Sequence, residues 1–256
     1  MLRTKQGLKY FAMGDGPEAV VCHPSLGLGR FLFYRLVPPL SRRYRVVTYD
    51  PRGVGENAAF APELDAWVND VGDLMEELDR PVHLMGVSLG TWVMSRAAVR
   101  WPDRVRRLVL MGTTPGFPNG AAQVEARREE LETLSMGDFA KQYASATLTA
   151  SADPEVREQL VLDLSAMNPE KYLESMAAIY TAENRAVFQA IGSETLIVVG
   201  SEDTRTVPRM ADQAAELIAG SVVRVVPNAG HLALLDQPSR MEELILGFLA
   251  SGIIDD

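Results

Sequence analysis

The fold of this chain is decided by one stretch, Val82-His83-Leu84-Met85-Gly86-Val87-Ser88-Leu89-Gly90. An apolar run enters a G-x-S-x-G pattern, and a helix-favouring stretch follows directly, to about residue 100. This order predicts a strand, a sharp turn with Ser88 at its apex, and a helix. Gly86 and Gly90 suit the turn because a Cβ at either position would clash where strand and helix pack closely. The N–H groups that open the helix would face any negative charge forming near Ser88.

A carboxylate and a histidine follow further along the chain, each at the end of an apolar, strand-like run. The first run ends in Gly200-Ser201-Glu202-Asp203, and the second ends in Asn228-Ala229-Gly230-His231. Because the carboxyl ends of parallel strands meet at one edge of a sheet, we expect Ser88, Asp203 and His231 to meet there. Without these partners, Ser88 would be interpreted as a helix-capping serine after a strand.

These three residue types suit nucleophilic catalysis. A neutral serine hydroxyl is a poor nucleophile, so it needs a base within hydrogen-bond reach, and that base needs an orienting group. His231 would take the proton from Ser88 and later give it to the leaving group, since imidazole titrates near neutrality. Asp203 would hold the imidazole tautomer, with the neighbouring Glu202 as a rival. Asp236 is a weaker rival, which we expect to cap the final helix.

The ordered series of motifs resembles the α/β-hydrolase superfamily over nearly the whole chain. The matching segments are Gly14-Asp15-Gly16-Pro17, Tyr49-Asp50-Pro51-Arg52-Gly53-Val54-Gly55, the Gly86 to Gly90 turn, Trp101-Pro102-Asp103-Arg104-Val105, Gly200 to Asp203, Gly230-His231-Leu232 and Gln237-Pro238. The chain is most similar to the small single-domain esterases, enol-lactonases and cofactor-free haloperoxidases. The resemblance implies an α/β fold with a mostly parallel central sheet flanked by helices and a helical cap insertion. It also favours Asp203 as the acid.

The resemblance further implies an oxyanion hole made of backbone N–H groups. Related hydrolases carry His-Gly-x after the corresponding strand, whereas this chain has His23-Pro24-Ser25-Leu26. Counting back without gaps from Pro39-Leu40 aligns Pro24-Ser25-Leu26 with the family's His-Gly-x, which makes the Leu26 N–H one donor. Aligning His23 with the family histidine makes the Ser25 N–H the donor instead. We expect Leu26, with the Leu89 N–H as the second donor. Two such donors would stabilise an acyl tetrahedral intermediate.

Strands and helices alternate along most of the chain, which predicts a parallel sheet covered on both faces. One expected helix, Phe31 to Leu40, contains Pro38-Pro39, which should bend or end it. From about Thr114 to Phe188 the alternation stops, and breaks there separate four expected helices: Ala121 to Leu134, Asp138 to Leu148, Pro154 to Ala166 and Pro169 to Ala182. This insertion resembles the cap of the family. We therefore expect a core of residues 1–114 and 189–256 and a helical cap of residues 115–188.

Bulk composition narrows the function classes. The chain has 256 residues, 47% of them hydrophobic, and a net charge of −9 without a basic cluster, so we expect neither nucleic acid nor an anionic membrane as a partner. Cys22 is the single cysteine, so no intramolecular disulfide can form. We see neither the apolar core of a signal peptide nor an apolar run long enough to span a bilayer, and we therefore expect the protein in the cytoplasm. Three histidines without a close pair predict no metal site, and the glycine spacings predict no dinucleotide or phosphate-binding loop. We expect no cofactor.

The function that these observations favour is a serine hydrolase acting on a small carboxylic ester or lactone through an acyl-enzyme. Within the same fold, a C–C bond hydrolase or an acyltransferase could use the same triad, and perhydrolysis of the haloperoxidase type could be a side activity. A non-catalytic ligand-binding protein on a hydrolase fold is the alternative from a different class.

Overall fold

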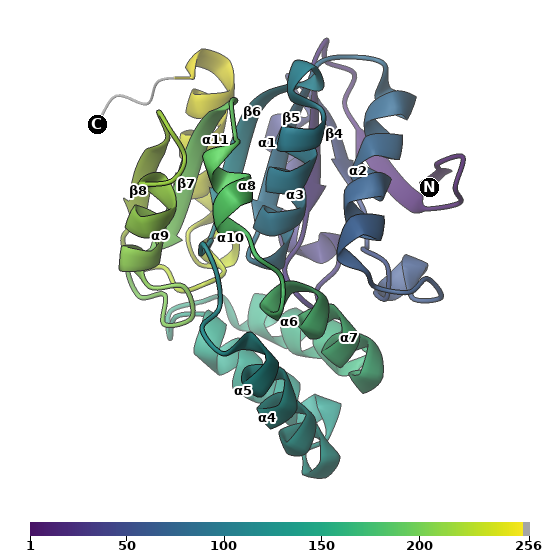
Figure 1. The fold of residues 1–256 in the computed structure, drawn as a ribbon, viewed down its shortest axis with the longest axis vertical. Helices are drawn as coiled ribbons and strands as arrows, with labels where there is room; N and C mark the ends of the chain where they lie inside the picture. The colour runs from purple at the N-terminus through teal and green to yellow at the C-terminus, as the bar shows by residue number, and fades with distance from the viewer. Residues whose placement is uncertain (253–256) are drawn as a thin grey trace.

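An eight-stranded sheet in the order β1-β2-β4-β3-β5-β6-β7-β8 forms the centre of the molecule (Figure 1). The computed structural model describes residues 1–252. The strands are β1 Leu2–Arg3, β2 Lys9–Met13, β3 Ala19–His23, β4 Arg45–Thr48, β5 Val82–Val87, β6 Val105–Met111, β7 Glu194–Gly200 and β8 Val222–Val226. Neighbours from β4 to β8 run parallel, whereas β1 and β2 pair antiparallel at the N-terminal edge. The mostly parallel sheet predicted from the sequence is confirmed.

The central strands are apolar because helices cover both faces of the sheet. Every residue of β3 and β5 is buried. The register pairs His23 with Gly86, and Gly86 with Leu110, so β3, β5 and β6 end close together. The loop after each of these strands therefore begins at the same edge of the sheet, which is where the sequence predicts the site.

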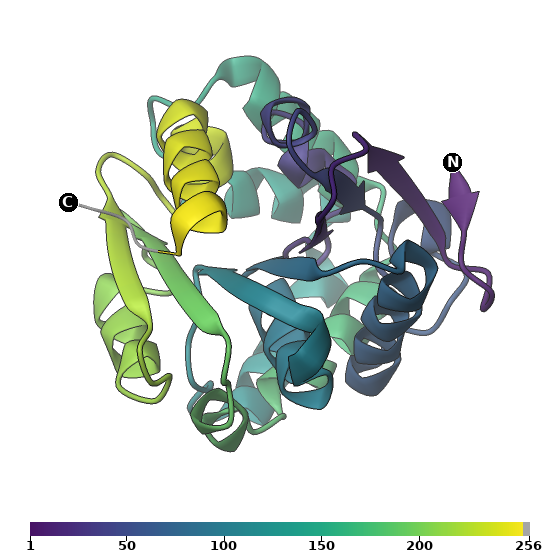
Figure 2. The same cartoon turned by 90° about the horizontal axis from the view of Figure 1, so that it is seen from above.

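Helices from distant parts of the sequence cover the two faces (Figure 2). On one face lie α1 Val37–Leu40 and α11 Pro238–Ser251, and on the other lie α2 Leu64–Leu78, α3 Leu89–Arg100, α8 Arg185–Gln189 and α9 Pro208–Ala215. Short helical segments complete the core: η1 Arg30–Phe33, η2 Gly55–Asn57, η3 Pro102–Arg104 and α10 Ala233–Asp236. No helix within residues 1–252 is long and apolar enough to cross a membrane.

One predicted helix is wrong. Instead of a single helix from Phe31 to Leu40, the chain forms the 3₁₀ segment η1, a turn, and then the short helix α1. Pro38 and Pro39 lie in the first turn of α1 and thus start it, where the prediction had them bend or end the helix. The physical reason is that N–H groups of a first helical turn have no intrahelical partner, so a proline loses nothing there.

The insertion between β6 and β7 is helical and lies beyond the carboxyl edge of the sheet (Figure 1). Its helices are α4 Gly120–Thr133, α5 Met136–Thr147, α6 Pro154–Ser165 and α7 Pro169–Tyr180, each within two residues of its predicted bounds. Three begin with a side-chain cap, in which Ser135, Asp153 and Asn168 accept backbone N–H groups. Farther along the chain, α8 packs against α3 of the core.

Candidate active site

Ser88 occupies a strained turn between β5 and α3. Its backbone has φ 53° and ψ −114°, an uncommon conformation for a residue with a Cβ, and its N–H donates to the Met111 carbonyl at 2.8 Å. A Cβ on Gly86 would lie 2.4 Å from the Gly90 carbonyl oxygen, and a Cβ on Gly90 would lie 2.3 Å from that of His23. Both glycines are therefore required by close approach of the backbone, as the G-x-S-x-G pattern indicates.

Asp203 and His231 meet at the loops that follow β7 and β8. The Nδ1–H of His231 donates to Asp203 Oδ2 at 2.8 Å, and both side chains are buried. The second carboxylate oxygen, Oδ1, accepts the backbone N–H groups of Arg205 and Thr206 at 2.8 and 2.9 Å. Burial would raise the pKa of Asp203, but hydrogen bonds from His231 and Thr206 outweigh it, so the pKa lies below its ordinary value. Glu202, the rival acid, lies exposed at the surface.

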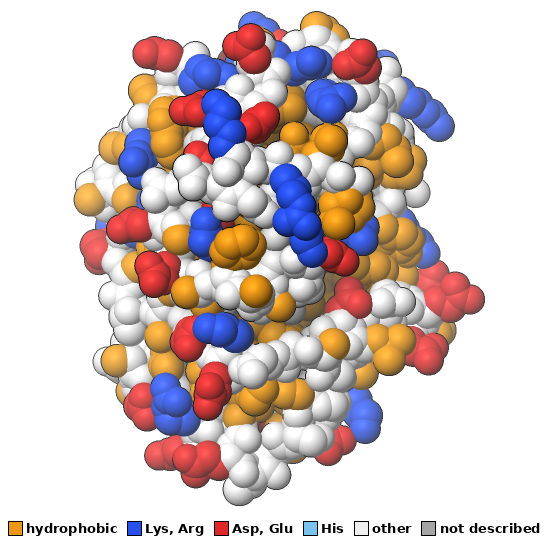
Figure 3. All heavy atoms as spheres, turned by 90° about the vertical axis from the view of Figure 1, so that its right-hand side faces the viewer, with side chains coloured by type: hydrophobic (Ala, Val, Ile, Leu, Met, Phe, Trp, Pro, Cys, Tyr) orange, Lys and Arg blue, Asp and Glu red, His pale blue; other side chains and the backbone are white. Residues whose placement is uncertain are grey.

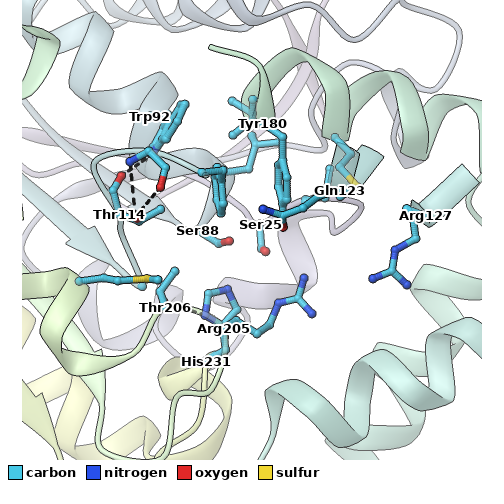
Figure 4. A pocket seen from close by; sticks show the side chains of 18 of the residues that line it. Ser25, Ser88, Trp92, Thr114, Gln123, Arg127, Tyr180, Arg205, Thr206 and His231 are labelled. Carbon is cyan, nitrogen blue, oxygen red and sulfur yellow. Dashed lines mark hydrogen bonds between the residues drawn. The ribbon is translucent and has the colours of Figure 1, made fainter. Parts of the chain in front are cut away.

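The serine and the histidine line one cavity of about 460 Å³ (Figure 4). The Ser88 hydroxyl and the His231 imidazole both extend into this space. Because Nδ1 carries the proton given to Asp203, the other ring nitrogen, Nε2, is the unprotonated one in the neutral ring and can accept a proton. The three residues named for the oxyanion hole, Leu26, Leu89 and the alternative Ser25, also line the cavity, and their role stays a prediction.

Two residues that the sequence analysis missed lie beside the imidazole of His231. The Thr206 hydroxyl donates to Asp203 Oδ2 at 2.7 Å and lies 3.1 Å from His231 Nδ1. Gly112, just after β6, has φ 64°, and a Cβ there would lie 3.0 Å from the Cε1 atom of His231. The sequence feature that could have pointed to Gly112 is a glycine directly after an apolar strand. For Thr206, the sequence offers no feature except its position three residues after Asp203.

The expectation for Asp236 is wrong. Asp236 ends α10, and the helix that follows begins after Gln237 without a side-chain cap. Its carboxylate instead accepts the Gly230 N–H at 2.8 Å and the Thr149 hydroxyl at 3.0 Å. These bonds are made because α10 turns the side chain back toward the loop after β8. Asp236 thereby ties the loop that carries His231 to the helical insertion.

The other two histidines lie within the fold, away from the cavity. His23 is fully buried, donates from Nδ1 to the Pro24 carbonyl at 3.0 Å, and packs edge-on against Tyr49. His83 is also buried, with Nε2 3.1 Å from a carboxylate oxygen of Glu18. Burial lowers the pKa of His23 to about 4, so its ring is neutral at pH 7. Both histidines are thus buried within the fold and are not part of the cavity that Ser88 and His231 line.

Acidification should lower the free energy of unfolding, with His23 contributing up to about 1.4 kcal/mol per pH unit. The unfolded chain protonates this histidine near pH 6.5 and the folded protein only near pH 4. Between these values the unfolded state binds more protons, so stability falls as the pH falls. Below about pH 4 both states are protonated and the loss stops. Urea unfolding of the wild type and His23→Asn from pH 7 to pH 4 measures this contribution, and parallel pH curves would contradict it.

The walls of the cavity combine apolar residues with three charged side chains. Core and insertion both contribute apolar groups, among them Trp92, Phe117, Met176, Ile179, Tyr180 and Met210. The charged residues are Arg127 and Glu130 of α4 and Arg205 of the loop after β7. On the outer surface, the face in Figure 3 carries acidic and basic side chains intermixed with small hydrophobic groups. That face therefore offers mixed charge rather than one continuous basic surface.

Comparison with known proteins identifies relatives along the whole chain. A pimeloyl-[acyl-carrier protein] methyl ester esterase of Methylococcus capsulatus is 28% identical over 263 residues, covering 96% of this chain and 100% of that protein. A 3-oxoadipate enol-lactonase of Acinetobacter baylyi is 24% identical, covering 98% and 97%. The polyketide synthase ThaQ of Burkholderia thailandensis is 27% identical over 92% of this chain, which spans only 12% of that protein's length. Relatives that are esterases and lactonases support hydrolase activity for this chain.

Solved structures agree with this relationship. The crystal structure of a hydrolase from Pseudomonas aeruginosa PA01 has a TM-score of 0.87 and 29% identity, covering 98% of this chain and 97% of that one. A model of the alpha/beta hydrolase fold family matches residues 18–238, which is most of the chain and includes Ser88, Asp203 and His231. This protein therefore belongs to the α/β-hydrolase fold family.

Proposed function

We propose that this protein is a serine hydrolase that cleaves a small carboxylic ester or lactone through an acyl-enzyme. The observation that carries the proposal is the buried 2.8 Å hydrogen bond between His231 and Asp203 beside the cavity into which Ser88 extends. Ser88 at its strained turn is the nucleophile, His231 is the general base and acid, and Asp203 orients the imidazole. The names of the relatives, a methyl ester esterase and an enol-lactonase, favour an ester or a lactone as substrate.

The reaction proceeds in two halves. Ser88 Oγ attacks the substrate carbonyl while its proton passes to His231 Nε2, and the imidazolium then protonates the departing alcohol. The negative charge on the carbonyl oxygen is stabilised by the backbone N–H groups of Leu26 and Leu89. A water molecule, deprotonated by His231, then attacks the acyl-enzyme. The bond between the acyl group and Ser88 Oγ breaks, Oγ takes the proton from His231, and the acid is released. When the substrate is a lactone, the ring opens, and the alcohol and acid groups remain in one product molecule.

The insertion, proposed as a cap of residues 115–188, supplies specificity. It contributes Arg127 from α4, Tyr143 from α5 and Tyr180 from α7 to the cavity wall. The nucleophile, base and acid all belong to the core, residues 1–114 and 189–256. This division allows the cap to select the substrate without supplying a reacting group.

A common acyl-enzyme should give the same product ratio from different esters of one acid. We expect methyl, phenyl and p-nitrophenyl butyrates, hydrolysed in the presence of hydroxylamine, to give one constant ratio of hydroxamate to free acid. The reason is that the leaving group has departed before water and hydroxylamine compete for the acyl group. Product analysis by chromatography measures the ratio. A ratio that changes with the leaving group would exclude the intermediate, and absence of any turnover would favour a ligand-binding protein.

A further inference from the structure

Arg205 brings a positive charge to the wall of the cavity. Its backbone N–H is used by Asp203, at 2.8 Å from Oδ1, so the loop that carries it is held beside the acid. Its guanidinium carbon lies 5.1 Å from the centre of the Tyr143 ring, and its side chain is half-buried. No aspartate or glutamate within residues 1–252 forms an ion pair with this guanidinium. An arginine is always charged, and a half-buried charge without a counterion is costly.

The second arginine of the cavity has a counterion of its own. Arg127 Nη1 lies 2.5 Å from Glu130 Oε2, and its guanidinium carbon stands 4.7 Å from the Phe139 ring centre. Both arginines line the cavity from different elements, Arg127 from α4 and Arg205 from the loop after β7 (Figure 4). The described charged residues of the cavity are thus two arginines and one glutamate, an excess of positive charge in a chain whose net charge is −9. This local positive charge lines the same cavity as Ser88 and His231.

We propose that Arg205 binds a carboxylate on the substrate, so that the protein acts on esters or lactones that also carry a free acid group. This rests on the proposed function, because Arg205 lines the same cavity as Ser88 and His231. A guanidinium can donate two parallel N–H groups to a carboxylate, and a partly desolvated site makes such charge-assisted bonds strong. Tyr143, whose ring lies against the guanidinium, keeps the side chain in position for this contact.

The competing interpretation is that Arg205 has only a structural role, packing against Tyr143 and hydrogen-bonding Tyr180. Removing a packing residue would change the rates for charged and neutral substrates by the same factor, whereas removing a carboxylate receptor would change their ratio. The measured quantity is therefore the ratio of kcat/KM for an acid to kcat/KM for the corresponding amide. Comparing this ratio between variants cancels intrinsic differences in reactivity between the two substrates.

Two substrate pairs place the charge on either side of the scissile bond. The first pair is the p-nitrophenyl monoester of glutaric acid and the same ester with the free acid converted to its amide. The second is 4-carboxyphenyl acetate and 4-carbamoylphenyl acetate. In Arg205→Gln we expect the acid-to-amide ratio to fall about 10- to 100-fold for at least one pair, mainly through KM. The pair that responds tells whether the acyl or the alcohol part reaches Arg205.

Charge and position are tested by matched variants. Arg205→Lys keeps the charge without the bidentate fork and should recover part of the ratio. Arg209→Gln, an exposed arginine of α9, should leave the ratio unchanged. Should Arg205→Gln fail to fold, the acid-to-amide ratio of Arg205→Lys against that of Arg209→Gln tests the same contact: a fall in the former alone supports it, and equal ratios overturn it. A ratio unchanged within twofold for both pairs in folded Arg205→Gln would overturn the proposal.

Equilibrium binding separates this proposal from the proposed function. In Ser88→Ala, glutarate should raise the melting temperature more than glutaramide, and the additional change of Arg205 to Gln should remove the difference. This measurement needs no turnover. If Ser88→Ala binds glutarate selectively but the wild type hydrolyses no ester, the proposed hydrolase activity is wrong and the anion site stands. If the wild type hydrolyses both the acids and the amides but Ser88→Ala does not bind glutarate selectively, the anion site is wrong and the hydrolase activity stands.

Discussion

Replacing Ser88 with alanine should lower kcat for ester hydrolysis by about 10⁶-fold, with the fold intact. The side chain is small and extends into the cavity, so its removal leaves no buried partner unsatisfied. What is lost is the nucleophile, and without it His231 has no hydroxyl to activate. Steady-state kinetics with a p-nitrophenyl ester measure the loss, and circular dichroism melting shows whether the protein stays folded.

A second serine provides the control for this prediction. Ser145 lies exposed on α5, and its hydroxyl donates to the Lys141 carbonyl at 3.0 Å within the same helix. Ser145→Ala should retain wild-type kcat. A fluorophosphonate should label the wild type and Ser145→Ala on Ser88 and should leave Ser88→Ala unlabelled. A phosphonate adduct found by mass spectrometry on another residue of the active wild type would contradict the assignment.

Changing Asp203 to asparagine should lower kcat by about 10⁴-fold, since it forces the wrong imidazole tautomer. Oδ1 accepts two backbone N–H groups, from Arg205 and Thr206, so the amide oxygen of the asparagine must take that position. The amide NH₂ then faces His231 Nδ1, which has to become an acceptor. The remaining proton moves to Nε2, and the ring can no longer accept a proton from Ser88. Kinetics on a p-nitrophenyl ester measure the effect.

The neighbouring carboxylate distinguishes this mechanism from a general loss of negative charge. Glu202 is exposed, so Glu202→Gln removes the same charge one position away and should change kcat by less than about twofold. A large loss in Glu202→Gln with near-normal activity in Asp203→Asn would reverse the two assignments. Equal losses in both variants would point to long-range electrostatics in place of an oriented hydrogen bond.

Much of the fold follows from local signals in the sequence. Helix α2, Leu64–Leu78, buries one apolar stripe at helical spacing, and such a stripe suffices to define a helix. The four insertion helices are delimited by proline, glycine and capping residues, whose effects are confined to a few neighbours. The prediction of one helix from Phe31 to Leu40 was wrong, because Pro38-Pro39 can either start or end a helix. Which of the two occurs depends on the path of the surrounding chain.

The parallel sheet, the glycine-flanked turn at Ser88, and the strand ends that carry Asp203 and His231 could be predicted, because each depends on residues adjacent in the chain. The packed structure was needed to show that Gly112 and Thr206 lie beside the imidazole, that Asp236 ties the His231 loop to Thr149, and that no acidic residue among residues 1–252 pairs with Arg205. These contacts join segments that are far apart along the chain or depend on which side chains share one cavity. Packing of the whole domain sets them, and no periodicity or spacing in the sequence records the result.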